Sequence, residues 1–332
     1  MRILSAATLA VLALGRLAGP APLAGQSQGS STEAALFLLL PVGAKGVGMA
    51  RAMTALEGSE SVWWNPAGLA GVEHSQVQVT RGEDVSGDGT SLTGLLRRPG
   101  LGTFGVSYHL LDLGDVTLTD RQGNPLGSVG FRYHTGVVSG ATRILGNLAL
   151  GMNFKIIQSR LSCRGECLDA GVTATTYAVD AGAQWRDLVG LPLTLGAALV
   201  HAGPRLQVLN EEQADPLPTR IRVAAAYDVL RHWELAEELH AHARLAVELE
   251  DRWRDPGSPA VYVGTELAAL QDPGISLRAG YAFGADLQVD GAGVGLGIRF
   301  ESFDLGISKS LASTTLAGET DPVNVTFGYL FR

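Results

Sequence analysis

The amino-acid sequence predicts an all-β fold, a transmembrane antiparallel β-barrel of about 14 strands with a small α-rich N-terminal hatch in its lumen. Three observations predict it. Apolar and polar residues alternate with a period of two, long connections alternate with short ones, and the chain begins with an export signal. We expect a signal peptide at 1–25, a hatch segment at 26–71 and the barrel at 72–332.

The N-terminal segment has the layout of a secretory signal peptide. Arg2 supplies the positive charge, an apolar stretch runs from Ile3 to Leu14, and small residues and prolines follow up to Gly25. The apolar stretch is too short to span a membrane, so we expect cleavage between residues 21 and 26. The alternative is an N-terminal helix buried in the fold.

The composition excludes several classes of protein. Glycine makes up 43 of 332 residues and charged residues 17%, against typical values of ~7% and ~25%, while apolar residues make up an ordinary 46%. So many apolar residues argue against disorder. The net charge of -8, with no basic cluster, argues against nucleic acid as a partner. Beyond the signal region no apolar run reaches the ~18 residues that a membrane helix needs.

The alternation predicts the strands. Between 176 and 186, one face carries Tyr177, Val179, Ala181, Ala183 and Trp185, and the other carries Thr176, Asp180, Gly182, Gln184 and Arg186. Such half-apolar segments are typical of strands, not of amphipathic helices. The segments with this pattern are 75–82, 90–98, 101–112, 129–144, 146–160, 174–187, 192–202, 219–230, 241–252, 260–270, 274–283, 292–301, 302–310 and 322–332.

The connections between these segments alternate in length. The odd ones are long and polar: 81–89, 113–128, 161–173, 203–218, 252–259, 284–293 and 311–321. The even ones are tight, except for "RHWELAEELHA" at 231–241, where Leu235 and Leu239 have helical spacing. Short turns at one end and long loops at the other are typical of outer-membrane barrels.

The polar face of the strands also favours a membrane barrel. It carries Lys155, Asp180, Arg186, Arg220, Arg222, Arg244, Glu248, Arg278, Arg299 and Asp304. With lipid outside, these side chains would face an aqueous or plugged lumen, whereas in a soluble β-protein they would point outward. Tyr177 and Trp185 would lie about 20 Å apart in height, near the ~25 Å between aromatic girdles. Gly293, Gly295 and Gly297 share the lumen face and leave room for something inside.

The segment before the first strand predicts a compact hatch. Val47, Ala50, Met53 or Thr54, and Leu56 form a short helical face, and 58–61 is a turn. In "SVWWNPAGLAG" (61–71), Asn65 is a natural N-cap with Pro66 at the first helical position, and the helix would end at Gly71. The piece is too small to fold alone, so Trp63 and Trp64 must pack against something, and the barrel lumen is the nearest cavity. The alternative is a periplasmic appendage that docks on a partner.

Residues 39–71 resemble the N-terminal signature of the PorV/PorQ family of outer-membrane proteins, in "PVGAKGVGMARAMTAL" and "SVWWNPAGLAG". That family is related to FadL-type barrels, which have fourteen strands and a hatch with an Asn-Pro-Ala motif. The corresponding hatch residues here are Trp63, Trp64, Asn65, Pro66, Ala67 and Gly68. The chain departs from the pattern at Ala50-Arg51 and at 58–60, where the family commonly has Gly-Gly and a paired-Asp turn, and in ending on Arg332 after Phe331.

The resemblance implies a location in the outer membrane of a Gram-negative cell, in contact with its lipid, and two possible functions. A PorV-like barrel takes part in type IX secretion or surface attachment, with cargo C-terminal domains and other secretion components as partners. We take this as the main hypothesis, because the N-terminal sequence is most similar to the PorV/PorQ signature. The alternative is a FadL-like channel for uptake of hydrophobic small molecules.

Nothing in the sequence predicts catalysis, a cofactor or a metal site. The seven histidines are His74, His109, His134, His201, His232, His240 and His242, and no G-x-S-x-G elbow accompanies them. His240 and His242 lack an evident third ligand, so we expect a solvated turn there.

The two cysteines, Cys163 and Cys167, stand in "CRGEC". In an exported chain an even count favours a disulfide, here in the surface loop after the fifth strand. Two free thiols are the alternative. A metal site would need more ligands than Glu166 and Asp169 provide.

Overall fold

The computed structural model describes residues 33–84, 87–166, 171–207, 214–270, 273–284, 291–311 and 323–331. The predicted signal peptide and residues 26–32 of the predicted hatch segment lie outside the described residues. The strands are β1 (Ser75–Asp84), β2 (Gly87–Arg98), β3 (Gly102–Thr119), β4 (Pro125–Arg143), β5 (Leu148–Gly165), β6 (Gly171–Trp185), β7 (Leu193–Ala202), β8 (Arg220–Asp228), β9 (His242–Arg252), β10 (Ala260–Ala269), β11 (Gly274–Phe283), β12 (Gly291–Phe300), β13 (Phe303–Ser310) and β14 (Val323–Phe331).

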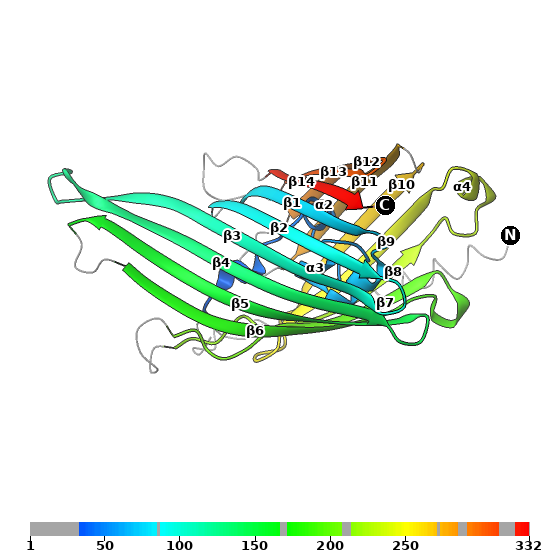
Figure 1. The fold of residues 1–332 in the computed structure, drawn as a ribbon, viewed down its shortest axis with the longest axis horizontal. Coiled ribbons are helices and arrows are strands. Elements are labelled where there is room, and N and C mark those ends of the chain that lie inside the picture. The colour runs from blue at the N-terminus through cyan, green and yellow to red at the C-terminus, as the bar shows by residue number, and fades with distance from the viewer. Residues whose placement is uncertain are drawn as a thin grey trace, which may run out of the picture. The chain divides into compact units, whose positions relative to one another are not determined.

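These strands form one closed antiparallel barrel (Figure 1). Strands that follow one another in the chain are neighbours in the sheet, and β1 pairs with β14 to close it, from Ser75 opposite Phe331 to Gly82 opposite Asn324. Closure leaves no open edge in the lipid, where an unpaired backbone amide or carbonyl group would have no water to bind. The predicted fourteen-stranded barrel is therefore confirmed.

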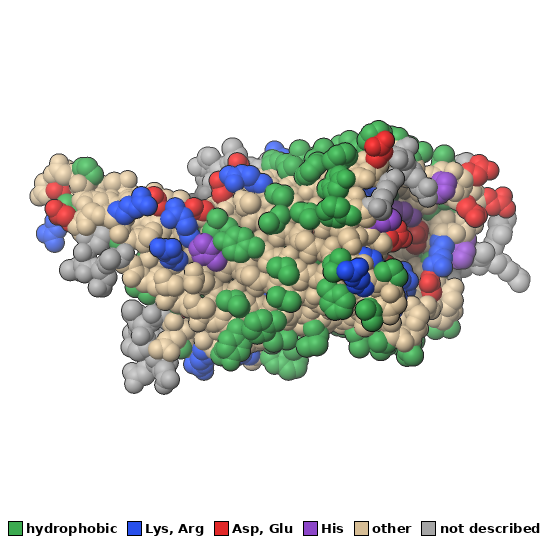
Figure 2. All heavy atoms as spheres, in the orientation of Figure 1, with side chains coloured by type: hydrophobic (Ala, Val, Ile, Leu, Met, Phe, Trp, Pro, Cys, Tyr) green, Lys and Arg blue, Asp and Glu red, His purple; other side chains and the backbone are tan. Residues whose placement is uncertain are grey.

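The apolar faces of the strands point outward and the polar faces inward. In β5, Met152 and Ile156 are 61% and 54% exposed, whereas Asn153 and Lys155 are 1% and 2% exposed. Figure 2 shows apolar side chains spread over the outside of the barrel. A soluble β-protein would have the opposite arrangement, so the barrel lies in the outer membrane with lipid against its outer face.

The polar residues predicted to face the lumen do so. Those buried inside the barrel are Lys155, Asp180, Arg220, Arg222 and Glu248. Others line wide cavities at the end of the tight turns: Arg244, Arg278, Arg299 and Asp304 in one, and Arg186 in a second. In outer-membrane barrels this turn end is periplasmic and the opposite end is extracellular.

Strands β3 to β6 are longer than predicted and project beyond the others at the extracellular end (Figure 1). The predicted loops 113–128 and 161–173 are mostly strand, because pairing continues to Thr119 opposite Pro125 and to Gly127 opposite Gly165. Outside the lipid the outward face of β4 becomes polar, while Val129 and Phe131 lie on the inner face, so the apolar-outward pattern of membrane strands does not continue there. We call the parts of β3–β6 above Asp112, Arg132, Arg160 and Thr173 the projection; these four residues form one paired row at its base.

The prediction of a long first loop at 81–89 is also wrong. β1 and β2 pair out to Asp84 opposite Gly87, which makes this connection tight. The Asp and Gly residues that suggested a loop lie in the two strands. The predicted alternation of long and short connections therefore holds only in the C-terminal half of the barrel.

Two short helices lie in the periplasmic connections, η3 (Leu188–Gly190) and α4 (Glu234–Glu238). α4 confirms the helical spacing predicted at 231–241. No helix among the described residues is long and apolar enough to cross a membrane.

We expect the barrel to be heat-modifiable on a gel. The closed sheet should survive detergent without boiling and migrate differently from the boiled, extended chain, because opening it would break a complete row of backbone hydrogen bonds at once. Electrophoresis of boiled and unboiled samples measures this. Recovery of the protein from the periplasm without detergent would contradict the membrane location.

Candidate functional site

The barrel lumen is filled by the N-terminal segment, and we call its residues 33–71 the hatch. Its short helices are η1 (Leu36–Leu39), α2 (Ala44–Gly48), α3 (Ser61–Trp64) and η2 (Pro66–Gly71). Backbone and side-chain hydrogen bonds join it to strands on several sides of the barrel, from β5 to β14. This confirms an α-rich hatch in the lumen.

The hatch helices differ in part from those predicted. The helical face expected from Val47 to Leu56 is wrong beyond Gly48, because Ala50 and Arg51 take left-handed backbone conformations (φ 46° and 77°) and end the helix. η2 agrees with the prediction, since Asn65 caps it and Pro66 is its first residue. The tryptophans lie on a separate helical turn, α3.

Asn65 fixes the hatch both to itself and to the barrel wall. Its Oδ1 accepts a hydrogen bond from the amide of Ala67 (3.1 Å), and its Nδ2 donates to the carbonyl oxygens of Thr54 (2.7 Å) and of Ala183 in β6 (3.3 Å). The sequence predicted the cap but not the two carbonyl partners, which are distant in the chain. Capping by Asn is worth about 1 kcal/mol.

Lumen glycines seat the hatch against the wall. A Cβ atom at Gly182 would lie 1.9 Å from Oδ1 of Asn65, and one at Gly196 would lie 2.3 Å from the carbonyl oxygen of Thr54. No side chain fits at such distances, so Gly182 lets the wall approach the side chain of Asn65, and Gly196 brings wall backbone against hatch backbone.

Two of the three glycines singled out in β12 serve the same purpose. A Cβ atom at Gly293 would meet the carbonyl oxygen of Val47 at 2.2 Å, and one at Gly295 would meet Gly48 at 3.3 Å. Gly297 instead leaves space for Ser276 and Arg278 of the neighbouring strand.

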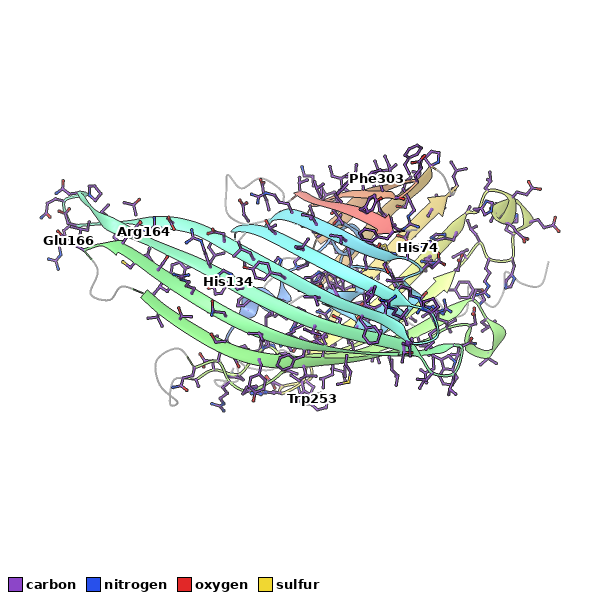
Figure 3. All side chains as sticks on the ribbon, viewed as in Figure 1. His74, His134, Arg164, Glu166, Trp253 and Phe303 are labelled. Carbon is purple, nitrogen blue, oxygen red and sulfur yellow. The ribbon has the colours of Figure 1, made fainter. Side chains whose placement is uncertain are left out.

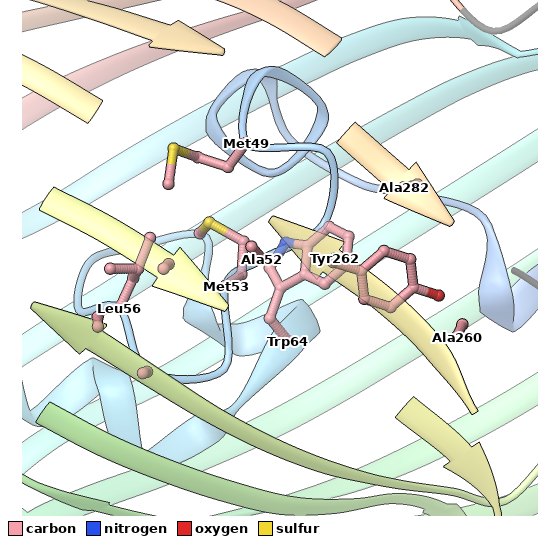
Figure 4. Packing of buried hydrophobic residues seen from close by; sticks show 11 residues of the cluster. Met49, Ala52, Met53, Leu56, Trp64, Ala260, Tyr262 and Ala282 are labelled. Carbon is pink, nitrogen blue, oxygen red and sulfur yellow. The ribbon is translucent and has the colours of Figure 1, made fainter. Parts of the chain in front are cut away.

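The apolar side of the hatch packs on small residues of the wall (Figure 4). Met49, Met53, Leu56 and Trp64 are each at most 3% exposed. Their wall partners are Ala226, Ala246, Ala260, Tyr262 and Ala282. Burying each large side chain stabilises the docked hatch by about 1.5–3 kcal/mol.

The two tryptophans differ in their surroundings. Trp64 is buried, donates a hydrogen bond from Nε1 to the carbonyl oxygen of Val42 (3.1 Å), and lies under the guanidinium of Arg222, 5.4 Å from the ring centre. Trp63 is partly buried and meets the ring of His109 edge-on at 5.7 Å. Pro66, Ala67 and Gly68, the remaining residues of the hatch motif, are buried.

Two buried carboxylates hold the hatch backbone. Glu248 of β9 accepts hydrogen bonds from the amides of Met53 (2.9 Å) and Thr54 (2.8 Å) and from the Thr54 hydroxyl (2.8 Å). Glu60 accepts from the amides of Lys45 (3.1 Å) and Gly46 (2.9 Å) at the start of α2. The role of Glu60 was missed, because in the sequence it is simply part of a turn.

Charged pairs between neighbouring strands line the lumen next to the hatch. Lys155 lies 2.7 Å from Asp180 and 3.2 Å from Nδ1 of His201, a histidine for which we predicted no role from the sequence. Arg222 pairs with Glu250 at 2.5 Å. Removing one partner of such a buried pair is strongly destabilising, since the other charge stays buried alone.

A cavity of about 30 Å³ lies between the hatch and these charged pairs. Its apolar side is formed by Phe37, Leu38, Leu39, Leu40, Val42, Trp63 and Trp64, and its polar side by Arg51, His109, Thr135, Lys155, His201 and Arg222. The charged side chains in this lining are all basic. Nη1 of Arg222 and Nε of Arg51 have no hydrogen-bond partner among the described residues. The cavity holds little more than one water molecule.

The lumen is wider on the periplasmic side of the hatch. A cavity of about 630 Å³ there is lined by residues of β1, β9–β14 and the hatch, including Lys45, His242 and Glu266. Glu266 lies within 4 Å of four basic side chains: Lys45 at 3.2 Å, Arg278 at 2.7 Å, His242 at 3.6 Å and Arg244 at 3.7 Å. The hatch therefore lies between this wide periplasmic vestibule and the small cavity next to residues 37–42.

The remaining residues singled out in the sequence lie elsewhere. Cys163 is near the end of β5 in the projection, but Cys167 lies outside the described residues, so their disulfide stays a prediction. His240 is in the turn after α4, and His242 begins β9. The described part of the chain has no group of three or more His, Cys, Asp or Glu residues that could hold a metal ion.

We predict that Gly182→Ala loosens the hatch. The added methyl group would displace Asn65, so the free energy of unfolding should fall by about 1–3 kcal/mol, as in overpacked cores. Tryptophan fluorescence during denaturation in detergent measures this. Gly136→Ala, at a β4 position with open space around it, is the matched control. Equal stability of both variants would contradict the close seating of Asn65.

Glu60 gives the docked hatch a pH dependence. Burial raises the pKa of its carboxyl above the ordinary 4.5, although the bonded amides of Gly46 and Lys45 act in the opposite direction. The docked state then binds the proton more tightly than the undocked state. This contribution is fully present below pH 4.5 and is lost as the pH rises through the raised pKa.

We therefore expect Glu60→Gln to flatten the pH dependence of hatch stability above pH 4.5, because glutamine cannot ionise. The midpoint of thermal unfolding followed by tryptophan fluorescence checks this across the pH range. Glu73→Gln, at an exposed position before β1, is the control. An unaltered pH profile in Glu60→Gln would show that another group controls the dependence.

No protein-family model and no curated protein matches the sequence. Solved structures do resemble the fold. The toluene transporter TbuX of Ralstonia pickettii has a TM-score of 0.58 at 10% identity, covering 89% of this chain and 100% of its own. The toluene transporter TodX of Pseudomonas putida has a TM-score of 0.56 at 11% identity, and the match covers 91% of this chain and 99% of TodX. A FadL homologue from Pseudomonas aeruginosa has a TM-score of 0.56 at 11% identity, and the match covers 88% of this chain and 99% of the homologue. At such identities the likeness concerns the fold: the chain is an outer-membrane barrel of FadL-like architecture.

Proposed function

We propose that the protein is a channel for uptake of hydrophobic small molecules, and that the molecules it takes carry an acidic group. The observation that carries this proposal is the cavity between the hatch and the wall, apolar on one side and purely basic among its charged lining residues on the other. A ligand with an apolar body and a carboxylate would satisfy both sides at once.

The basic side of this cavity has spare hydrogen-bonding capacity. Arg51 is 4% exposed and Arg222 is 2% exposed, and each has a guanidinium nitrogen without a hydrogen-bond partner among the described residues. Buried donors of this kind are usually satisfied, so an anionic oxygen placed there would gain a charge-assisted bond. A purely apolar ligand would leave them unsatisfied.

The ligand enters by displacing the segment 33–42. That segment supplies most of the apolar side of the cavity. Few polar contacts hold it: Glu33 to Arg220 at 2.7 Å, the amide of Ala34 to the carbonyl of Pro216 at 2.9 Å, Arg51 to the carbonyl of Leu39, and Nε1 of Trp64 to the carbonyl of Val42 at 3.1 Å. Phe37 also stacks on Tyr133, with ring centres 4.3 Å apart. An apolar ligand can replace the leucine and phenylalanine contacts without loss of burial.

The main reading from the sequence, a barrel for type IX secretion or surface attachment, rests on the resemblance of residues 39–71 to PorV/PorQ. No contact among the described residues favours cargo domains or secretion components as partners. The solved structures with this fold include transporters of toluene and a channel for monoaromatic hydrocarbons, which favours uptake.

The test compares an acidic and a neutral probe. Cells that produce the protein should take up decanoate faster than cells without it, and the gain should be smaller for toluene, which has no acidic group. Arg51→Gln should lower decanoate uptake about tenfold or more, because a hydrogen bond to a charged group is worth ~1.5–3 kcal/mol. Toluene uptake should hardly change. Arg299→Gln, at the periplasmic end, is the control with the same loss of charge.

Two outcomes would contradict the proposal. If cells that produce the wild type took up both probes no faster than cells without the protein, the result would favour the secretion hypothesis. Equal loss of both probes in Arg51→Gln would mean that Arg51 maintains the lumen and does not recognise the ligand.

A further inference from the structure

Two arginines stand directly opposite each other on the outer face of the barrel. Arg132 of β4 pairs in register with Arg160 of β5, at the base of the projection. Directly opposed like charges in an antiparallel pair are destabilising unless an anion lies near. Arg164 lies four residues after Arg160 on the same face of β5, further from the membrane.

The side-chain alternation of β5 fixes the direction of these arginines. The inward residues Lys155 and Ile157 are buried, and the outward residues Phe154 and Ile156 are exposed to lipid. No register shift interrupts the pairing of β4 with β5, so Arg160 and Arg164 point outward as well. Figure 3 shows Arg164 on the projection, and Figure 2 shows basic side chains on its outer face.

Arg160 lies at the depth of the lipid headgroups, and Arg164 lies further out on the same face. Below them, Tyr108 and Tyr177 are 43% and 55% exposed, and Tyr177 stacks on Phe154, as expected of the aromatic girdle at the lipid boundary. Along β5, Arg160 is four residues beyond Ile156 and Arg164 is eight, which places them about 10 Å and about 20 Å further out at ~3.3 Å per residue and a tilt of ~40°.

The protein itself supplies too little negative charge for this patch. Asp112 and Asp115 of β3 bind Arg132, at 2.8 Å and 3.6 Å. Arg160 and Arg164 are exposed, and neither is in an ion pair with another described residue. In a chain with a net charge of -8, an outward arginine pair with no carboxylate partner is a local excess of positive charge.

Hydroxyl groups surround the two arginines. Thr173 of β6 lies opposite Arg160, Ser128 of β4 lies opposite Arg164, and Ser162 stands between the arginines on the same face. Arginine forks bind phosphate oxygens bidentately, and the hydroxyls of Thr173 and Ser128 can donate to the oxygens that remain, whereas Ser162 donates to the carbonyl of Gly130.

We propose that Arg160 and Arg164 bind the phosphate groups of an outer-leaflet lipid, with Arg132 and the neighbouring hydroxyls at the edge of the site. The acyl chains of that lipid lie against the apolar outer faces of β4 to β6 directly below. The site commits to a membrane lipid because the arginines continue the same strand faces that contact lipid, at the level where phosphates lie.

The test measures retention of lipid by the purified protein in detergent, using native mass spectrometry with bisphosphorylated lipid A as the probe. The wild type should retain the lipid, and Arg160→Gln with Arg164→Gln should weaken binding at least tenfold. Arg121→Gln with Arg254→Gln is the control: it removes two exposed arginines from extracellular connections and should leave binding unchanged. Heat-modifiable migration of each variant verifies that the barrel is folded.

Further arms identify the source of the phosphate. Lipid A without phosphates should bind as weakly to the wild type as intact lipid A binds to the double variant. Excess inorganic phosphate should not displace the lipid, because the acyl chains add apolar contact area. Undiminished binding by the double variant, equal loss in the control, or displacement by phosphate alone would each overturn the proposal.

Discussion

The hydrogen-bonded seam between β1 and β14 is the constraint on which the rest of the structure depends. A sheet in lipid has to close, since an open edge would leave amide and carbonyl groups without partners. Once the sheet is closed, its alternation assigns every side chain to lipid or lumen. The lumen then receives charged and hydroxyl side chains that have to be satisfied by something other than bulk water. In this barrel the N-terminal hatch meets that need, with Glu248, Asn153 and Gln184 bonded to its backbone.

The sequence predicted the features that repeat and missed those that depend on partners far apart in the chain. Strands β7 to β14 follow from alternation, because one face of each contacts lipid throughout. The ends of β3 to β6 could not be predicted in this way, since beyond Asp112 and Arg160 the outward face no longer contacts lipid and becomes polar. The cap at Asn65 is local and was predictable from the Asn-Pro pair.

The bonds of Asn65 to Thr54 and Ala183 were not predictable, and neither were the contacts of His201 with Lys155 and with Asp180, because each requires knowledge of the closed barrel. The helix expected up to Leu56 failed for a different reason. Its apolar spacing is real, but those side chains pack on the alanines of the wall from a chain that turns at Ala50 and Arg51. Spacing alone does not distinguish a helix face from a turn whose apolar residues are held by a wall.

The contacts between the hatch and the last strand have a consequence for assembly. The amide of Ala44 donates to the hydroxyl of Thr326, 282 positions later in the chain, and that hydroxyl also donates to Glu60. These bonds cannot form until the C-terminus has been delivered. The first segment of the protein to be exported is thus among the last to reach its final partners, and it has to be held without them while the wall grows. Contacts so distant in the chain form slowly. Docking of the hatch is therefore expected to be a slow step of folding, although each of its helices has at most six residues.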